Sequence, residues 1–140
     1  PARKVGGLDN LNVLCIDNDP TILEGMATLL RGWHCNVIAA SSYDDAKKKS
    51  AHSRPDIILA DYQLDNGENG LDTMDQLQLF FNDSTPIARI PGVLVTAQTG
   101  QELIDETHSR GYQILHKPVK PAGLRAMMTK LIKTQAQSHQ

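Results

Sequence analysis

Five short apolar runs, separated by stretches with a different periodicity, are the feature that most constrains how this chain can fold. Each run is too short for a helix and has the apolar character of a strand that is buried in a parallel sheet. The runs cover residues 12–16, 36–39, 56–60, 92–95 and 113–115. The pattern therefore predicts five strands that are covered on both faces.

The segments between these runs carry apolar residues at helical spacing. Such faces comprise Ile22, Met26, Leu29 and Leu30, then Leu71, Met74 and Leu77, and finally Leu124, Met128, Leu131 and Ile132. Pro121 opens the last of these segments, at a helix position where a missing N–H costs nothing. We expect a helix after each strand.

Strands that alternate with amphipathic helices predict right-handed crossovers and a parallel sheet with helices on both faces. The expected fold class is therefore α/β, a five-stranded doubly wound parallel sheet with five helices. Sheets of this kind bind ligands outside the carboxyl ends of their strands. The residues that follow each apolar run are therefore the ones to examine for chemistry.

One domain is expected over residues 11–133. Residues 1–10 and 134–140 lack apolar periodicity, so we expect a linker or disordered segment and a C-terminal tail. Because the chain begins with Pro1 rather than Met, we expect it to be part of a longer protein.

Composition excludes several classes of protein. The chain has 140 residues, 40% of them hydrophobic, and a net charge of -2, which is typical of a globular domain and offers no basic field for nucleic acid. No apolar stretch is long enough to span a membrane. Cys15 and Cys35 are too few for a disulfide framework, so a reducing, cytoplasmic setting is expected.

Polar residues of particular types follow four of the five runs. The first run ends in Asp17, Asn18 and Asp19, and the third, fourth and fifth lead to Asp61, Thr96 and Lys117. The fold would carry all of them to one edge of the sheet. Carboxylates suit Mg²⁺, and a lysine suits phosphate, so the set predicts a magnesium and phosphoryl site.

These residues carry a resemblance to a known family. The runs 13–20, 57–61 and 93–97, together with Lys117-Pro118, resemble the response-regulator receiver (CheY-like) domains of two-component phosphorelays, over roughly residues 11 to 133. The sequence around Asp17 and in residues 92–97 and 116–121 looks most like that of the C-terminal receiver of a hybrid sensor histidine kinase. The resemblance implies a flavodoxin-like strand order of 2-1-3-4-5 and a cis Lys117–Pro118 bond.

The resemblance also implies roles for the site residues. Asp61 is expected to accept a phosphoryl group from phosphohistidine as a carboxylate nucleophile. Thr96, the backbone N–H of Ala97 and Lys117 would bind phosphoryl oxygens, and phosphorylation would switch the conformation. Such a domain catalyses its own phosphorylation but is no turnover enzyme on a small substrate.

Mg²⁺ is the expected cofactor, held by Asp17, Asp61 and the backbone carbonyl of Gln63. The chain departs from the commonest family pattern by having Asn18 where a second acid is usual. Asp19 could supply the missing charge directly or through a metal-bound water. It could equally be the N-cap of the helix that begins at Pro20, and the two roles do not exclude each other.

Two alternatives stay open from the sequence. One is a receiver-like interaction module that works without phosphorylation, suggested by Asn18 and by Ile114 at a position where the family often has an aromatic residue. The other is a haloacid-dehalogenase-like phosphatase, suggested by Asp17-x-Asp19-x-Thr21. Chain order argues against the phosphatase, because its last acidic motif should follow Lys117.

The partner implied by the resemblance is a histidine kinase or a histidine phosphotransfer protein. A homodimer through the last two helices, residues 101–109 and 121–133, is a further expectation. No nucleic acid and no direct membrane contact are expected, although the parent protein of a cytoplasmic receiver is sometimes attached to a membrane.

Overall fold

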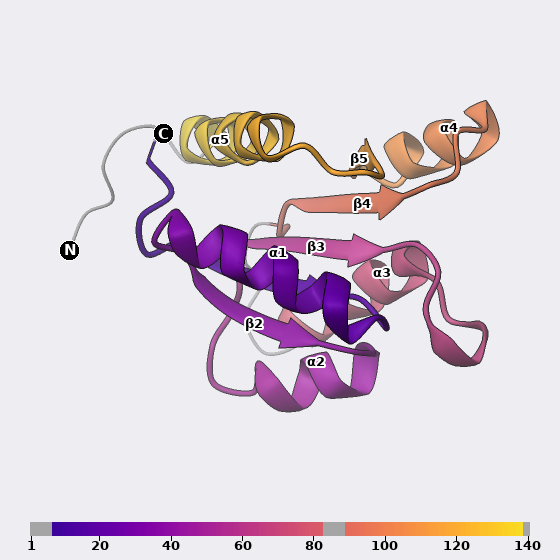
Figure 1. Cartoon of the computed structure of the whole chain (residues 1–140), viewed down its shortest axis with the longest axis horizontal. Coiled ribbons are helices and arrows are strands. Elements are labelled where there is room, and N and C mark those ends of the chain that lie inside the picture. The colour runs from indigo at the N-terminus through magenta and orange to yellow at the C-terminus, as the bar shows by residue number, and fades with distance from the viewer. Residues whose placement is uncertain (1–6, 83–88, 139–140) are drawn as a thin grey trace.

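The computed structural model describes residues 7–82 and 89–138. The chain alternates strands and helices from end to end (Figure 1). The elements are β1 (Asn12–Ile16), α1 (Pro20–Gly32), β2 (Asn36–Ala40), α2 (Tyr43–Lys49), β3 (Ile57–Asp61), the 3₁₀ turn η1 (Asp65–Gly67), α3 (Gly70–Phe81), β4 (Gly92–Thr96), α4 (Gln101–Ser109), β5 (Gln113–His116) and α5 (Pro121–Ser138).

The strands form one parallel sheet in the order β2-β1-β3-β4-β5, which confirms the predicted fold class. The strand order reverses at β1. The next strand in sequence, β2, lies on one side of β1, and the strand after it, β3, lies on the other side. Such a reversal opens a crevice at the carboxyl ends of the two central strands, where ligands bind in folds of this type.

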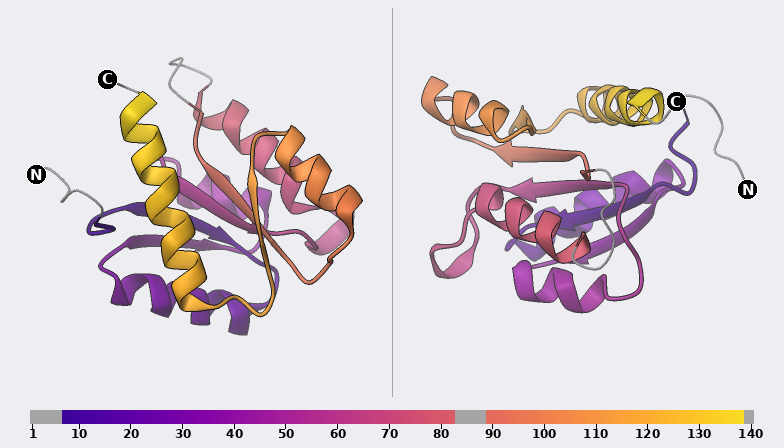
Figure 2. Two further views of the ribbon diagram at one scale, coloured as in Figure 1. Left: turned by 90° about the horizontal axis from the view of Figure 1, so that it is seen from above. Right: turned by 180° about the vertical axis from the view of Figure 1, so that it is seen from behind.

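Helices cover both faces of the sheet. α2, α3 and α4 contribute Ala46, Met74 and Leu103 to one apolar cluster, and α1 and α5 contribute Leu30 and Met128 to the other. α1 lies in front of the sheet in Figure 1, and α3 lies in front of it when the molecule is seen from behind (Figure 2). This two-sided burial explains why the strands are continuous apolar runs rather than alternating ones.

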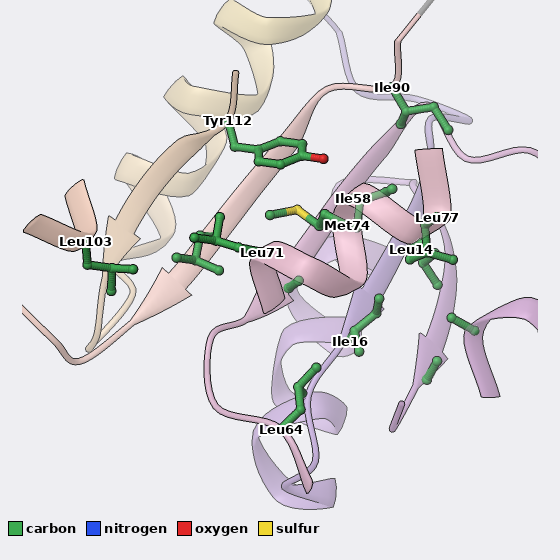
Figure 3. Packing of buried hydrophobic residues seen from close by; sticks show 14 residues of the cluster. Leu14, Ile16, Ile58, Leu64, Leu71, Met74, Leu77, Ile90, Leu103 and Tyr112 are labelled. Atoms are coloured by element: carbon green, nitrogen blue, oxygen red, sulfur yellow. The ribbon is translucent and has the colours of Figure 1, made fainter. Parts of the chain in front are cut away.

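Alternate residues of each central strand enter opposite clusters. In β1, Leu14 and Ile16 face the α3 side, while Val13 and Cys15 face the α1 and α5 side. Figure 3 shows Leu14 and Ile16 in the first cluster, with Leu71, Met74 and Tyr112. A one-residue slip of the strand would exchange the two sets, so the packing fixes the register that places the strand ends.

The chain packs at both ends of the expected domain. Leu8 is 1% exposed and joins the α1 and α5 cluster, although it lies in the segment expected to be a linker. Residues 1–6 of that segment lie outside the described residues. α5 continues to Ser138, through most of the expected tail, because residues 134–138 contain no helix breaker. Across the described residues, no helix has the length and apolarity that a membrane span needs.

Candidate functional site

Three strands of the sheet, β1, β3 and β5, deliver the acidic and basic side chains to one edge of the sheet. Asp17 follows β1, Asp61 is the last residue of β3, and Lys117 follows β5. Thr96 ends β4, which lies between β3 and β5 in the sheet. The backbone N–H of Lys117 donates to the carbonyl oxygen of Thr96 at 2.9 Å, so the register continues into the site.

Lys117 joins the two carboxylates. Its Nζ lies 3.1 Å from Asp61 Oδ1 and 3.8 Å from Asp17 Oδ2. Both aspartates are buried: Asp61 is 9% exposed and Asp17 is 8% exposed. The side chain of Lys117 is 27% exposed. The Lys117–Pro118 bond is cis, as the resemblance implied. The site therefore holds two nearly buried carboxylates with one ammonium between them.

Burial raises the pKa of Asp17 above its ordinary value, and the negative charge of Asp61 raises this pKa further. The backbone N–H of Asp19, which donates to Asp17 Oδ1 at 2.9 Å, and the ammonium of Lys117 act in the opposite direction. The two aspartates thus repel each other electrostatically. An added cation would relieve that repulsion.

Thr96 is 2% exposed, and its hydroxyl oxygen accepts a hydrogen bond from the backbone N–H of Gln98 at 3.0 Å. A hydroxyl accepts and donates at the same time, so the Thr96 hydrogen stays available for a further acceptor. Ala97, whose backbone N–H is also predicted to bind a phosphoryl oxygen, is exposed at the start of the same loop. The Thr96 side chain thereby ties the strand end to the loop that leads into α4.

The structure gives Asp19 and Asn18 separate partners. Asp19 is the N-cap of α1, and its carboxylate accepts from the N–H groups of Thr21 at 2.9 Å and Ile22 at 3.4 Å. Asn18 donates from Nδ2 to Asp65 Oδ1 at 2.8 Å, across to the loop that follows β3. The capping role predicted for Asp19 is confirmed, whereas a metal role for either residue stays a prediction.

The loop after Asp61 is closed by its own backbone. Gln63 and Asn69 form an antiparallel bridge, and the N–H of Gly70 donates to the carbonyl oxygen of Tyr62 at 2.8 Å. Among the described residues, no hydrogen bond is made to the carbonyl oxygen of Gln63. That oxygen is therefore available as an acceptor, and its role as a metal ligand stays a prediction.

Sequence reasoning missed Gly70, the first residue of α3. A Cβ at this position would overlap the carbonyl oxygen of Asp61 and would lie 2.8 Å from a methyl carbon of Leu94. The helix can approach β3 this closely only because residue 70 has no side chain. The signal available in the sequence was a glycine directly after a good N-cap residue, Asn69.

The donor set fits Mg²⁺. In the part of the chain that the structure describes, no three His, Cys, Asp or Glu side chains gather into a metal-binding group. Mg²⁺ does not require such a group, because it retains several waters and binds through one or two carboxylates. Asp17 and Asp61, with the free carbonyl of Gln63, provide that minimal set.

An apolar cavity of about 390 Å³ adjoins the site. Asp17, Asp61 and Lys117 line its polar end, while Cys15, Leu29 and Val119 are among the residues of its apolar part. The cavity lies between α1 and the segment that links β5 to α5.

The fold and the site together define a class of protein: a doubly wound α/β domain with two aspartates and a lysine at its topological switch point. Comparison with known proteins narrows this class. Residues 13–129 match the model of the response regulator receiver domain. The chain belongs to this family.

Two curated relatives illustrate the membership, and one solved structure shares the fold. The Phyllosphere-induced regulator PhyR of Methylorubrum extorquens is 30% identical over 122 residues, which are 86% of this chain and 43% of PhyR. Protein PilG of Pseudomonas aeruginosa is 32% identical over 113 residues, covering 79% of this chain and 78% of PilG. The chemotaxis response regulator CheY4 of Vibrio cholerae has a TM-score of 0.72 at 20% identity, with 86% and 98% of the two chains covered.

Family membership confirms the resemblance and decides against the phosphatase alternative. The chain spans less than half of PhyR, so the activity and partners of a whole protein do not follow from the match. Placement at the C-terminus of a hybrid histidine kinase stays a prediction.

Proposed function

We propose that this receiver domain is a phosphoacceptor, in which Asp61 takes a phosphoryl group from the phosphohistidine of a partner protein. The observation that carries the proposal is the 3.1 Å contact between Lys117 Nζ and Asp61 Oδ1, made at a carboxylate that is only 9% exposed. A carboxylate buried at a strand end is fixed in position, and the ammonium offsets part of the charge repulsion that an incoming phosphoryl group would meet.

The proposed step is a direct displacement at phosphorus. A carboxylate oxygen of Asp61 forms a new P–O bond while the P–N bond to the partner's histidine breaks. The imidazole nitrogen keeps the electron pair of that bond and takes up a proton. Mg²⁺, held by Asp17, Asp61 and the Gln63 carbonyl, would neutralise charge on the carboxylates and on the phosphoryl oxygens.

The neighbouring groups then bind the transferred oxygens. Lys117 donates to one of them, and Thr96 donates its hydroxyl hydrogen while it still accepts from the N–H of Gln98. The backbone N–H of Ala97 is a third donor. Since Thr96 is bonded to the 97–100 loop, phosphorylation would shift the equilibrium of that loop and of α4.

The proposed partner is a histidine kinase or a histidine phosphotransfer protein in the cytoplasm. Two observations support a signalling role: the family membership, and the likeness to PilG and to a protein described as a regulator, PhyR. A homodimer through α4 and α5 would be one way to transmit the switch, and attachment to a hybrid kinase would place the domain beside its donor.

Phosphoryl uptake from a small phosphodonor with Mg²⁺ tests the proposal, by intact mass and by peptide mapping. Wild type should gain one phosphoryl group on Asp61, and Asp61→Asn should gain none while it keeps its thermal unfolding midpoint within a few degrees. Asp44→Asn, which removes an exposed acid from α2, is the matched control and should be phosphorylated normally. Uptake by Asp61→Asn at the wild-type rate would refute the proposal.

A second candidate function is an interaction module that is not phosphorylated. Asn18 favours it, because an amide is a weaker ligand than the usual acid. Under this function the mass of wild type stays unchanged with phosphodonor and Mg²⁺, while the partner still binds.

A further inference from the structure

The carboxylate that is absent at position 18 has a counterpart elsewhere in the chain. Asn18 Nδ2 donates to Asp65 Oδ1 at 2.8 Å, between residues that are 47 positions apart. Asp65 belongs to η1, in the loop that follows the phosphoacceptor strand. The negatively charged carboxylate of Asp65 therefore contacts the side chain of Asn18, the residue after Asp17.

This contact fixes the orientation of the Asn18 amide. An ionised carboxylate only accepts hydrogen bonds, so the NH₂ group of Asn18 must face Asp65, and no exchange of the amide nitrogen and oxygen is possible. The two polar atoms of an amide lie on different sides of the same carbon. The carbonyl oxygen of Asn18 is therefore directed away from Asp65 and stays available as a neutral ligand.

The backbone of the loop holds Asp65 in place. Leu64, the preceding residue, is 9% exposed and packs in the core cluster under α3. The carbonyl oxygen of Asp65 accepts from the N–H of Glu68 at 3.1 Å, and the N–H of Leu64 donates to the carbonyl oxygen of Glu68 at 3.1 Å. Asn66 and Gly67 have positive φ values, which close this tight turn. The backbone at Asp65 is thus held by a packed anchor and a hydrogen-bonded turn, and the carboxylate itself contacts Asn18.

Asp19 has a different primary role, because its Oδ1 accepts both capping hydrogen bonds of α1 and only its Oδ2 is left for a metal or a metal-bound water. Mg²⁺ usually keeps several of its waters, and those waters donate hydrogen bonds to acceptors around the metal. Removal of such an outer hydrogen-bond partner typically lowers metal affinity by about 10- to 100-fold. Asp65 is exposed in the free protein, so its charge is well solvated until a divalent cation arrives nearby.

We propose that Asp65 is an outer carboxylate of the magnesium site, which does not contact the metal and which replaces the charge of the acid that is absent at position 18. It acts as a positioning residue: it orients the Asn18 carbonyl oxygen toward the metal and accepts hydrogen bonds from metal-bound water. The inference rests on the proposed phosphoacceptor function, because that function brings Mg²⁺ to Asp17 and Asp61.

Titration with Mg²⁺ alone, followed by calorimetry or by NMR shifts of the loop amides, tests this role without any phosphodonor. Asp65→Asn should weaken Mg²⁺ binding by roughly tenfold. Asp44→Asn, which changes the net charge equally from an exposed position on α2, should bind Mg²⁺ as wild type does. If the two variants bind Mg²⁺ within twofold of each other, the proposal is overturned.

A charge exchange separates this role from a merely structural one. Asn18→Asp alone should lower the thermal unfolding midpoint of the metal-free protein, because two carboxylates would then meet at the 2.8 Å contact, and Mg²⁺ should restore it. The double variant Asn18→Asp/Asp65→Asn rebuilds the contact with its polarity reversed, and should recover Mg²⁺ affinity to within threefold of wild type. A double variant as weak as Asp65→Asn would contradict the proposal.

The two hypotheses fail separately. Loss of Mg²⁺ affinity in Asp65→Asn with no phosphorylation of wild type would keep the metal role and remove the phosphoacceptor function. Normal phosphorylation of wild type with unchanged Mg²⁺ affinity in Asp65→Asn would do the reverse.

Discussion

Asp17 and Asp19 are two residues apart and have the same side chain, but they have different structural roles because their surroundings differ. Asp17 is 8% exposed, faces Asp61 and Lys117, and has a raised pKa because it is buried. Asp19 is exposed and caps α1. The difference arises because the chain turns from β1 into α1 between them, so that only the first carboxylate points across the strand ends.

Gly70 permits the first prediction at this scale. Gly70→Ala should destabilise the fold by about 1–3 kcal/mol, because the added Cβ overlaps the carbonyl oxygen of Asp61 and crowds Leu94. Urea denaturation measures the change in the free energy of unfolding. Displacement of the Asp61 backbone should also slow phosphoryl uptake by more than the loss of stability explains.

Gly25→Ala is the control for that experiment. Gly25 lies inside α1, and among the described residues nothing lies within 4 Å of a Cβ placed there. This substitution should stabilise the protein by up to about 1 kcal/mol, since alanine is the better helix former. Equal effects of the two substitutions would contradict the packing argument for Gly70.

The sequence predicted which residues form the site but not their contacts. Asp17, Asp61, Thr96 and Lys117 could be assigned to one edge because each ends or follows an apolar run. The Asn18–Asp65 contact could not, because the conformation of the loop after Asp61 depends on the burial of Leu64 and on two positive φ values. The requirement for glycine at position 70 could not be predicted either, because it depends on how closely α3 approaches β3.

At the scale of elements, a polar network joins α3 to the end of α4 and to β5. Arg110, the C-cap of α4, contacts Asp72 at 2.8 Å and Asp75 at 3.1 Å on α3, and Glu106 at 2.7 Å on its own helix. Tyr112, the residue before β5, donates its hydroxyl hydrogen to Asp75 Oδ1 at 2.6 Å. Movement of α4 after phosphorylation would have to rearrange these bonds.

Tyr112→Phe tests the strength of this network. Tyr112 is 1% exposed, so loss of its bond to a carboxylate should lower the free energy of unfolding at pH 7 by about 1.5 kcal/mol. Tyr43→Phe on α2 is the control, because among the described residues the Tyr43 hydroxyl has no hydrogen-bond partner. A Tyr112→Phe variant as stable as Tyr43→Phe would show that the Asp75 bond contributes nothing net.

The same variant has a predicted pH dependence. Burial, and then the bond to Asp75, raise the pKa of Tyr112 above its ordinary value of about 10. The folded state therefore favours the neutral phenol, and this contribution to stability is complete below about pH 10 and declines as the pH rises toward the folded pKa. The difference in unfolding free energy between wild type and Tyr112→Phe should shrink above pH 10. A constant difference up to pH 11 would contradict this account.

Element boundaries followed the sequence closely. The first strand was predicted without error. Each of the other strands ends one residue later than expected, and β3 also begins one residue later, at Ile57. The additional residue of β2 is Ala40, whereas β3, β4 and β5 each gain a polar residue that still takes part in the ladder. Asp61, for example, is paired with Val95 as the last residue of β3. Apolar periodicity cannot reveal a polar residue that keeps the strand's backbone bonds.

At the scale of the whole molecule, the site adjoins the hydrophobic core, and some residues belong to both. Cys15 lies in β1 two residues before Asp17, is 2% exposed, and lines the apolar part of the cavity that adjoins the site. Burial raises the pKa of its thiol to about 12, so almost none of it is thiolate at neutral pH. The thiol should react only when the sheet opens.

Labelling of Cys15 in a Cys35→Ala background should therefore report opening of the fold. At pH 8 the rate should be at least about 1000-fold below that of the chain unfolded in urea, since even a marginal domain is stable by about 5 kcal/mol. A ligand that binds only the folded state reduces the open population by the factor 1 + [L]/Kd. Mg²⁺ with beryllofluoride, at about 100 times its Kd, should slow labelling about 100-fold more in this variant and have no effect once Asp61→Asn is added. Rapid labelling that the ligand leaves unchanged would instead mean that reagent enters through the cavity, and that the strand ends and the core do not open as one unit.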